Sequence, residues 1–192
     1  PMTPPPPVGT PTRDVLSRKG ELLIRLEHYL DGDPTQPEAY ARFRARMAHI
    51  QSEYDEWSTV VFDSVTFAEL AARMEAQFVT LRTSKEPRQW FGASTDALEQ
   101  MLMFRFSSMP CNTVVLCHVD EEKDEVHGMH VRAPKAPGRL KKGLPSAYQE
   151  YYRAFPRHSA AGQPEYLVQT QSDALWNAAT QIEAPNPSAS HY

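Results

Sequence analysis

The segment Thr59-Val-Val-Phe-Asp-Ser64 indicates the fold class, because it places an unbroken apolar run directly before a carboxylate and a hydroxyl. A second run of this kind, Thr113-Val-Val-Leu-Cys-His118, lies further along the chain. Strands that read as continuous apolar runs are buried on both faces, and parallel sheets provide such burial. Both segments are therefore predicted to be buried strands of a parallel sheet.

Further β-prone runs and helical patterns surround these two strands. The additional strands are expected over 21–27 and 166–170, and the helices over 37–52, over 67–78 and from about Asp96 onward. Strands that alternate with helices imply right-handed crossover connections. The predicted fold class is therefore α/β, a mostly parallel open sheet with helices on both faces.

The length and composition fit one globular domain with loose ends. The chain has 192 residues, of which 41% are hydrophobic and 17 are proline. Domains usually have about 100–200 residues, so two full cores are not expected. Residues 1–12 hold six of the prolines and are predicted to form an extended arm. The α/β domain is expected over 13–183, followed by a C-terminal tail over 184–192.

Charge and cysteine content exclude several classes of protein. The net charge is −4, so no overall positive field is present and any nucleic-acid site must be a local patch. The two cysteines cannot form a disulfide framework, which favours the cytoplasm, or the host cytoplasm for a viral protein. No apolar run approaches the roughly 18–20 residues of a membrane span, so no membrane partner is expected.

The candidate catalytic residues follow from where the strands end, because ligands of open α/β sheets bind at the carboxyl ends of the strands. Asp63 at such an edge suits the magnesium ion of a nucleotide, with the hydroxyl of Ser64 beside it. The alternative is that Asp63 or Ser64 caps the next helix. Glu27 suits a group that positions an attacking water, and otherwise is a solvated strand end. His118 suits a group that senses the terminal phosphate, and otherwise holds a backbone group.

A strongly basic stretch follows an acidic one. Residues 120–125 hold five acids and one lysine and are expected to form a solvated loop. Residues 132–158 hold seven cations and one acid, with four aromatic side chains among them. The candidate nucleic-acid-binding residues there are Arg132, Lys135, Arg139, Lys141 and Lys142. Aromatic rings between cations suit single-stranded nucleic acid, while the alternative is an amphipathic helix over 146–155 with its aromatics in the core.

A transition-metal site is a further alternative, because histidine and carboxylate side chains occur close together in this part of the chain. The residues are His118, Asp120, His127 and His130. His127 and His130 are expected in a loop rather than on one helix face, where such a spacing would bring two ligands together.

In order and type, these residues resemble RecA-like P-loop ATPases, and most closely those of the phage recombination and single-strand-annealing kind. The resemblance covers about residues 20–183 and rests on the segments ending at Glu27, Asp63 and His118. It implies a RecA-like core, ATP with Mg²⁺, single-stranded DNA as partner and a homo-oligomer. It also implies that Glu27 activates water, that Asp63 is the Walker B aspartate and that His118 is the polar sensor.

One part of the family pattern is missing from this chain. The phosphate-binding loop, Gly-x-x-x-x-Gly-Lys-Ser/Thr, does not occur in the 192 residues. Two interpretations follow, an ATPase domain that lacks its Walker A loop in this chain, or a non-catalytic module that binds nucleic acid or protein. A third is a viral assembly component whose proline-rich arm docks on a protein partner.

Overall fold

The computed structural model describes residues 11–52, 57–123, 128, 130–159, 162–172 and 178–180. The chain divides into two compact units, the first ending at Leu116 and the second beginning at Cys117. The arm predicted over 1–12 lies outside the described residues except for its last two, and the predicted tail over 184–192 lies outside them entirely.

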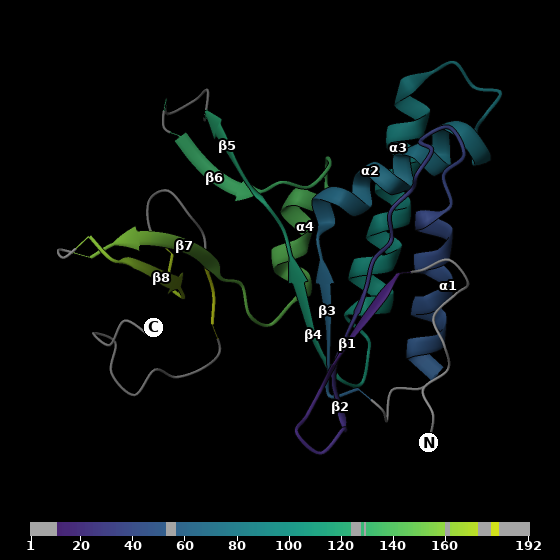
Figure 1. Cartoon of the computed structure of the whole chain (residues 1–192). Coiled ribbons are helices and arrows are strands. Elements are labelled where there is room, and N and C mark those ends of the chain that lie inside the picture. Colours follow the sequence, from purple (N-terminus) through teal and green to yellow (C-terminus); the bar gives the residue numbers. More distant parts are fainter. Residues whose placement is uncertain are drawn as a thin grey trace. The chain divides into compact units, whose positions relative to one another are not determined.

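The first unit contains three helices, two π-helical segments (η) and four strands among the described residues (Figure 1). In chain order these are β1 (Thr12–Leu16), β2 (Leu22–Glu27), α1 (Ala39–Ser52), β3 (Thr59–Asp63), α2 (Val65–Glu75), η2 (Ala76–Thr80), α3 (Pro87–Glu99), η3 (Gln100–Phe106) and β4 (Asn112–Leu116). Helices were expected over 37–52 and 67–78, and α1 and α2 with η2 confirm both.

Strands β3 and β4 form a parallel pair, as the two apolar runs predict. Val61 lies opposite Val114, and Asp63 lies opposite Leu116. One face of this pair is packed, with Phe62 only 7% exposed, whereas on the other face Val61 is 57% exposed and Val114 41%. The prediction of burial on both faces is therefore wrong for the described residues.

A chain of aromatic rings joins the parallel pair to the helices of the first unit. The ring centre of Phe43 in α1 lies 5.1 Å from that of Phe62 in β3, which in turn lies 6.0 Å from that of Phe106 in η3. Leu98 and Leu102 are fully buried on α3 and η3. Helix α2 packs on both α1 and α3. The core of this unit therefore lies between one face of a small sheet and its helices.

The predicted fold class is wrong, because the described residues contain no extended parallel sheet. Their strands form four separate two-stranded pairs, and only β3 with β4 is parallel. The described residues therefore do not form the predicted mostly parallel open sheet with helices on both faces, and they do not form a RecA-like core.

Local pairing explains why β2 does not join β3. Strand β2 pairs with β1 in an antiparallel hairpin whose turn holds Gly20 at φ +82°. Arg25 donates two hydrogen bonds to Asp14 across the hairpin, at 2.9 and 3.0 Å. Closing a short turn costs little conformational entropy, so β2 pairs with the neighbouring β1. The sequence analysis did not predict β1, because its segment lies beside the proline-rich stretch.

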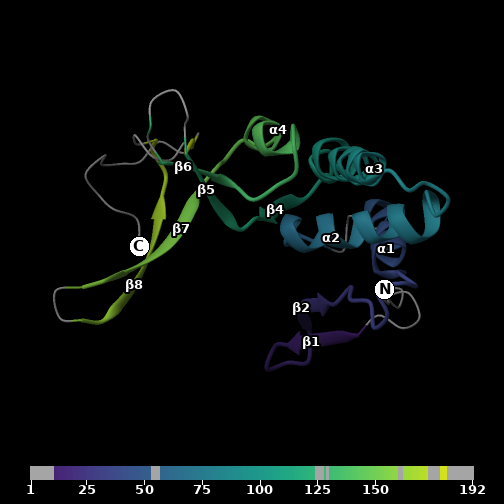
Figure 2. The ribbon, with the colours of Figure 1, turned by 90° about the horizontal axis from the view of Figure 1, so that it is seen from above.

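Among the described residues, the second unit consists of two antiparallel hairpins and one helix, which are labelled in Figure 2. The elements are β5 (Val119–Lys123), β6 (His130–Pro134), α4 (Leu140–Ala147), β7 (Arg153–His158) and β8 (Pro164–Gln169). Of the solvated loop expected over 120–125, residues 120–123 lie in strand β5 and the last two lie outside the described residues. The alternative helix over 146–155 is wrong, because most of that segment follows α4 and leads into β7.

The third helix of the first unit begins earlier than expected. Asp96 lies inside α3 rather than at its start, so the capping pattern with Glu99 is not used there. The helix begins at Pro87, whose fixed φ suits a first helical position, and Glu86 before it is extended.

Within the described residues, no helix combines the length and the apolar character that a membrane crossing needs.

Candidate functional site

A cavity of about 850 Å³ in the first unit brings together three of the residues singled out from the sequence. Glu27 at the end of β2, Asp63 at the end of β3 and Ser64 before α2 all line it. Most of the other lining side chains are apolar and come from β2, α1, β3 and α2. Ligand sites usually have about 300–1,000 Å³ and an apolar lining with a few polar groups, so the cavity has the size and character of a binding site.

Asp63 and Ser64 lie where the parallel pair ends and α2 begins. Asp63 is exposed, and Ser64 is 3% exposed. The backbone oxygen of Ser64 accepts the first hydrogen bond of α2, from the N–H of Ala68 at 3.1 Å. The strand therefore delivers an exposed carboxylate and a buried hydroxyl to one edge of the cavity.

The hydroxyl of Ser64 does not cap α2. Ser64 has the extended backbone of an N-cap residue, with φ −137° and ψ 162°, but its side chain makes no capping hydrogen bond. Its buried Oγ has no hydrogen-bond partner among the described residues. The capping alternative is therefore wrong for Ser64, and a buried hydroxyl on the cavity wall is left unpaired.

Glu27 is held by two neighbours. Nε of Arg46 donates to both carboxylate oxygens, at 3.0 and 3.1 Å, and the hydroxyl of Tyr29 donates to one of them at 2.6 Å. The side chains of Arg46 and Glu27 are 3% and 11% exposed, so this is a buried ion pair. Burial, and then the hydrogen bond to Glu27, raise the pKa of Tyr29. Glu27 lies at the end of β2, as expected, but the alternative of a solvated strand end is wrong.

Sequence reasoning missed two more polar groups of this cavity. Tyr40 and Trp57 line it, and the Tyr40 hydroxyl and the Trp57 Nε1 are buried without a hydrogen-bond partner among the described residues. Tyr40 lies within the helix predicted over 37–52, and that pattern carries no sign of a polar role. Asp31 was missed too, since its Oδ1 accepts hydrogen bonds from the N–H groups of Glu38 and Ala39 at the start of α1.

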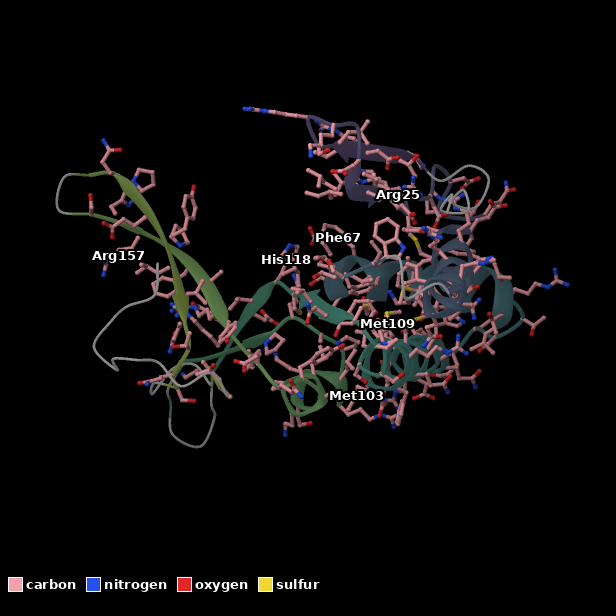
Figure 3. The ribbon with its side chains drawn as sticks, turned by 90° about the horizontal axis from the view of Figure 1, so that it is seen from below. Arg25, Phe67, Met103, Met109, His118 and Arg157 are labelled. Carbon is pink, nitrogen blue, oxygen red and sulfur yellow. The ribbon has the colours of Figure 1, made fainter. Side chains whose placement is uncertain are left out.

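Apolar side chains on the cavity wall remain exposed to solvent. Phe67, at the first turn of α2 and labelled in Figure 3, is 60% exposed, and Leu23 on β2 is also 60% exposed. Exposed apolar surface beside unpaired polar atoms is typical of a site for a ligand with both apolar and polar parts.

His118 belongs to the second unit and is exposed there. Its backbone oxygen accepts a hydrogen bond from the N–H of Lys135 at 2.6 Å. The chain reaches it two residues after the end of β4, the strand that pairs with the Asp63 strand. The expected adjacency of the two strands is confirmed, and the role of His118 as a sensor stays a prediction.

Acidic side chains of β5 engage part of the predicted nucleic-acid surface. Arg132 donates to Glu121 at 2.6 Å across the β5–β6 hairpin, and the Nζ of Lys141 lies 3.8 Å from a carboxylate oxygen of Asp120. Lys135, Arg139 and Lys142 are exposed. The acidic and basic stretches, which the sequence presents as separate, therefore partly neutralise each other.

Of the four aromatic residues of the basic stretch, three are half-buried and Tyr152 is exposed. Burial raises the pKa of Tyr148, and raises that of Tyr151 to about 12. The guanidinium carbon of Arg153 lies 4.6 Å from the ring centre of Phe155. Two of the four rings are thus partly withdrawn from solvent, and a third already stacks on a cation of its own unit.

The described residues hold no group of three or more His, Cys, Asp or Glu side chains placed to bind a metal ion, and His127 lies outside those residues.

Comparison of the chain with protein-family models, with curated proteins and with solved structures found no match.

Proposed function

We propose that this chain is a domain of an ATP-hydrolysing protein of the phage recombination kind, in which Asp63 holds the magnesium ion of a bound nucleotide. One observation carries the proposal: Glu27 and the adjacent pair Asp63 and Ser64, which lie far apart in the sequence, line the same cavity. The proposal rests on this cavity and on the parallel pair β3–β4, not on a larger sheet.

The residues at this edge suit a magnesium ion. Mg²⁺ prefers oxygen ligands and is usually held by one or two carboxylates, waters and substrate phosphates. Asp63 offers an exposed carboxylate, and the unpaired hydroxyl of Ser64 is an oxygen without another use in the described structure. A magnesium ion bound here would neutralise charge on the phosphate oxygens of the nucleotide.

Glu27 has a different place in this proposal. Its two oxygens already accept hydrogen bonds from Arg46 and Tyr29, so a water-activating role requires that Arg46 release it. We therefore assign nucleotide and magnesium binding to Asp63 and Ser64, and expect the contribution of Glu27 to turnover to depend on Arg46.

Binding of a fluorescent ATP analogue, measured by anisotropy with and without Mg²⁺, tests this function. We expect magnesium-dependent binding that Asp63→Asn weakens by about tenfold or more, since hydrogen bonds and ligand contacts to charged groups have effects of this order. Glu86→Gln, which neutralises an exposed acid at the start of α3, is the matched control and is expected to leave binding unchanged.

The same assay separates the alternatives. If the full chain shows no magnesium-dependent binding, or if Asp63→Asn binds like the unchanged chain, the ATPase proposal fails and the non-catalytic module is favoured. Binding without turnover of ATP favours a nucleotide-binding module that lacks the phosphate loop.

We propose single-stranded DNA as a second ligand, and the exposed cations Lys135, Arg139 and Lys142 support DNA binding. We also propose that the protein acts in the host cytoplasm as a homo-oligomer. Lys142→Ala is expected to weaken binding of a single-stranded oligonucleotide and to lower its salt dependence by about 0.7 in log–log slope for each phosphate that the lysine neutralises. Lys141→Ala should have less effect, because Asp120 already engages Lys141, and Lys19→Ala is the control.

A further inference from the structure

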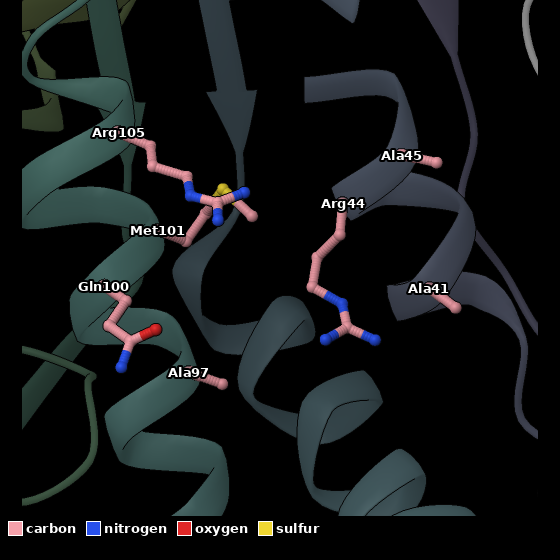
Figure 4. A pocket seen from close by; sticks show the side chains of 7 residues that line it. All are labelled: Ala41, Arg44, Ala45, Ala97, Gln100, Met101 and Arg105. Atoms are coloured by element: carbon pink, nitrogen blue, oxygen red, sulfur yellow. The ribbon is translucent and has the colours of Figure 1, made fainter. Parts of the chain in front are cut away.

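A second pocket, of about 320 Å³, lies in the first unit between α1 and the α3–η3 segment (Figure 4). It is lined by Ala41, Arg44, Ala45, Ala97, Gln100, Met101 and Arg105. None of these residues lines the cavity that holds Asp63. The three alanines leave room between the helices, and the buried side chain of Met101 closes one side.

Two guanidinium groups reach into this pocket from opposite helices. Arg44 extends from α1 and Arg105 from η3; in Figure 4 Arg105 points toward the middle of the view, and Arg44 runs downward from its helix. Like charges on the wall of one small pocket repel, and an anion bound there reduces the repulsion. Gln100 adds an uncharged amide to the same wall.

The two arginines differ in how they are held. Arg44 donates to a carboxylate oxygen of Glu75, and its guanidinium carbon lies 5.2 Å from the ring centre of Tyr40. Arg105 has no ion pair or side-chain hydrogen bond among the described residues. The pocket therefore combines one cation in a fixed position with one that is available to a ligand.

The buried phenol of Tyr40 lies within the electrostatic reach of both arginines. Burial raises the pKa of Tyr40 to about 12, whereas the charges of Arg44 and Arg105 act in the opposite direction. The carboxylate of Glu75 acts on Tyr40 in the same direction as burial.

We infer that the pocket formed by Arg44, Gln100 and Arg105 binds the phosphate group of a small phosphorylated ligand. Guanidinium groups match the geometry of phosphate oxygens through paired hydrogen bonds. Two guanidiniums and an amide offer more donors than the two oxygens of a carboxylate use, which favours a phosphate. The volume suits a phosphate together with a small organic group, because ligand pockets begin at about 300 Å³.

Isothermal titration of the full chain with inorganic pyrophosphate, in magnesium-free buffer at low ionic strength, tests this site. We expect binding at one site that Arg105→Gln weakens by about tenfold or more. Glu75→Gln should strengthen binding, because it removes the carboxylate that competes for Arg44. Arg82→Gln, at an exposed position away from the pocket, is the matched control and should bind like the unchanged chain.

The outcomes are separable from those of the proposed nucleotide site. Asp63→Asn should leave magnesium-free pyrophosphate binding intact, so failure of one site does not imply failure of the other. The inference is overturned if pyrophosphate does not bind, or if Arg105→Gln binds as well as Arg82→Gln. Arg105 is exposed, so its replacement is expected to preserve the helical circular dichroism spectrum even where Arg44→Gln does not.

Two further titrations distinguish the source of the phosphate. Acetate should compete weakly with pyrophosphate, and equal competition by acetate would overturn the preference for phosphate. If a short single-stranded oligonucleotide competes and no longer does so in Arg105→Gln, the phosphate comes from a nucleic acid. If it does not compete, the ligand is a small phosphorylated molecule.

Discussion

Arg46 and Ser64 line the same cavity but differ in how their polar atoms are satisfied. Arg46 is buried and bound to the carboxylate of Glu27, whereas the buried hydroxyl of Ser64 has no partner among the described residues. A paired buried charge adds specificity and is costly to break, while an unpaired buried hydroxyl lowers stability until something binds it. Breaking the Arg46 ion pair and removing the Ser64 hydroxyl are therefore expected to have opposite effects on stability.

Glu27→Gln is expected to destabilise the chain strongly. The substitution removes the negative charge that two hydrogen bonds from the buried guanidinium of Arg46 engage, and breaking a buried ion pair typically costs about 3–5 kcal/mol in the free energy of unfolding. Urea denaturation followed by circular dichroism measures the change. Glu86→Gln, at an exposed site, should stay within about 0.5 kcal/mol. A decrease below about 1 kcal/mol in Glu27→Gln would show that Arg46 finds water or another partner.

Ser64→Ala is expected to leave stability unchanged or to raise it by about 1 kcal/mol, since it removes a buried polar atom that has no hydrogen bond. The same variant should bind the magnesium–nucleotide complex more weakly if the proposed function holds. Thermal unfolding with and without nucleotide measures both effects. A clear decrease in stability without ligand would contradict the structure, because it would mean that the hydroxyl caps α2 after all.

At the scale of elements, short-range pairing prevails over the long crossovers that the pattern of strands and helices implies. Hairpin β1–β2 closes through the turn at Gly20, and β7–β8 likewise pairs neighbouring segments. In β5–β6 the pair Glu121–Arg132 joins strands whose composition alone indicates a loop. Cross-strand ion pairs of this kind support weak strands by a few tenths of a kcal/mol up to about 1 kcal/mol.

Two glycines allow a matched test of these elements. Gly20 has φ +82° in the β1–β2 turn, where a Cβ is strained, so Gly20→Ala is expected to cost about 1–2 kcal/mol. Gly92 lies inside α3 with open space around it, so Gly92→Ala should gain about 0.5–1 kcal/mol. Urea denaturation of both variants measures these shifts. Equal effects of the same sign would show that backbone conformation does not govern them.

At the scale of the whole molecule, burial is uneven across the chain. The fully buried side chains of α3 and η3, Leu98, Leu102 and Phe106, belong to the first unit. In the second unit, β7 and β8 expose most of their residues, with Tyr166 77% exposed. Isolated two-stranded hairpins are only marginally stable, so the two units should differ in how readily they open.

Hydrogen exchange followed by mass spectrometry is expected to show this difference. Amides of α3 and η3 should exchange slowest, because they open only with the core of the first unit, and amides of β7 and β8 should exchange at least about tenfold faster. The comparison is internal to one sample and needs no variant. Equal protection of β7–β8 and α3 would show that the hairpin is covered by contacts beyond those described.

The candidate site was partly predictable, because it depends on local chemistry. The apolar runs predicted β3 and β4 and their parallel pairing, and the carboxylate and hydroxyl that follow β3 do reach the wall of a cavity. The unpaired hydroxyls of Ser64 and Tyr40 were not predictable, since a missing partner depends on everything packed nearby. The capture of Glu27 by Arg46 was missed for the same reason, as the two residues lie 19 positions apart.

Local sequence patterns predict helices α1 and α2 and strands β2, β3, β4 and β8, because apolar periodicity and turn residues act over a few positions. The pairing of the other strands depends on the folded chain, since backbone hydrogen bonds carry no residue-specific signal and a nearby partner such as β1 competes with a distant one. The tertiary structure also decided that Arg44 and Arg105, 61 positions apart, share one pocket. That proximity comes from how α1 and η3 pack, which no local pattern specifies.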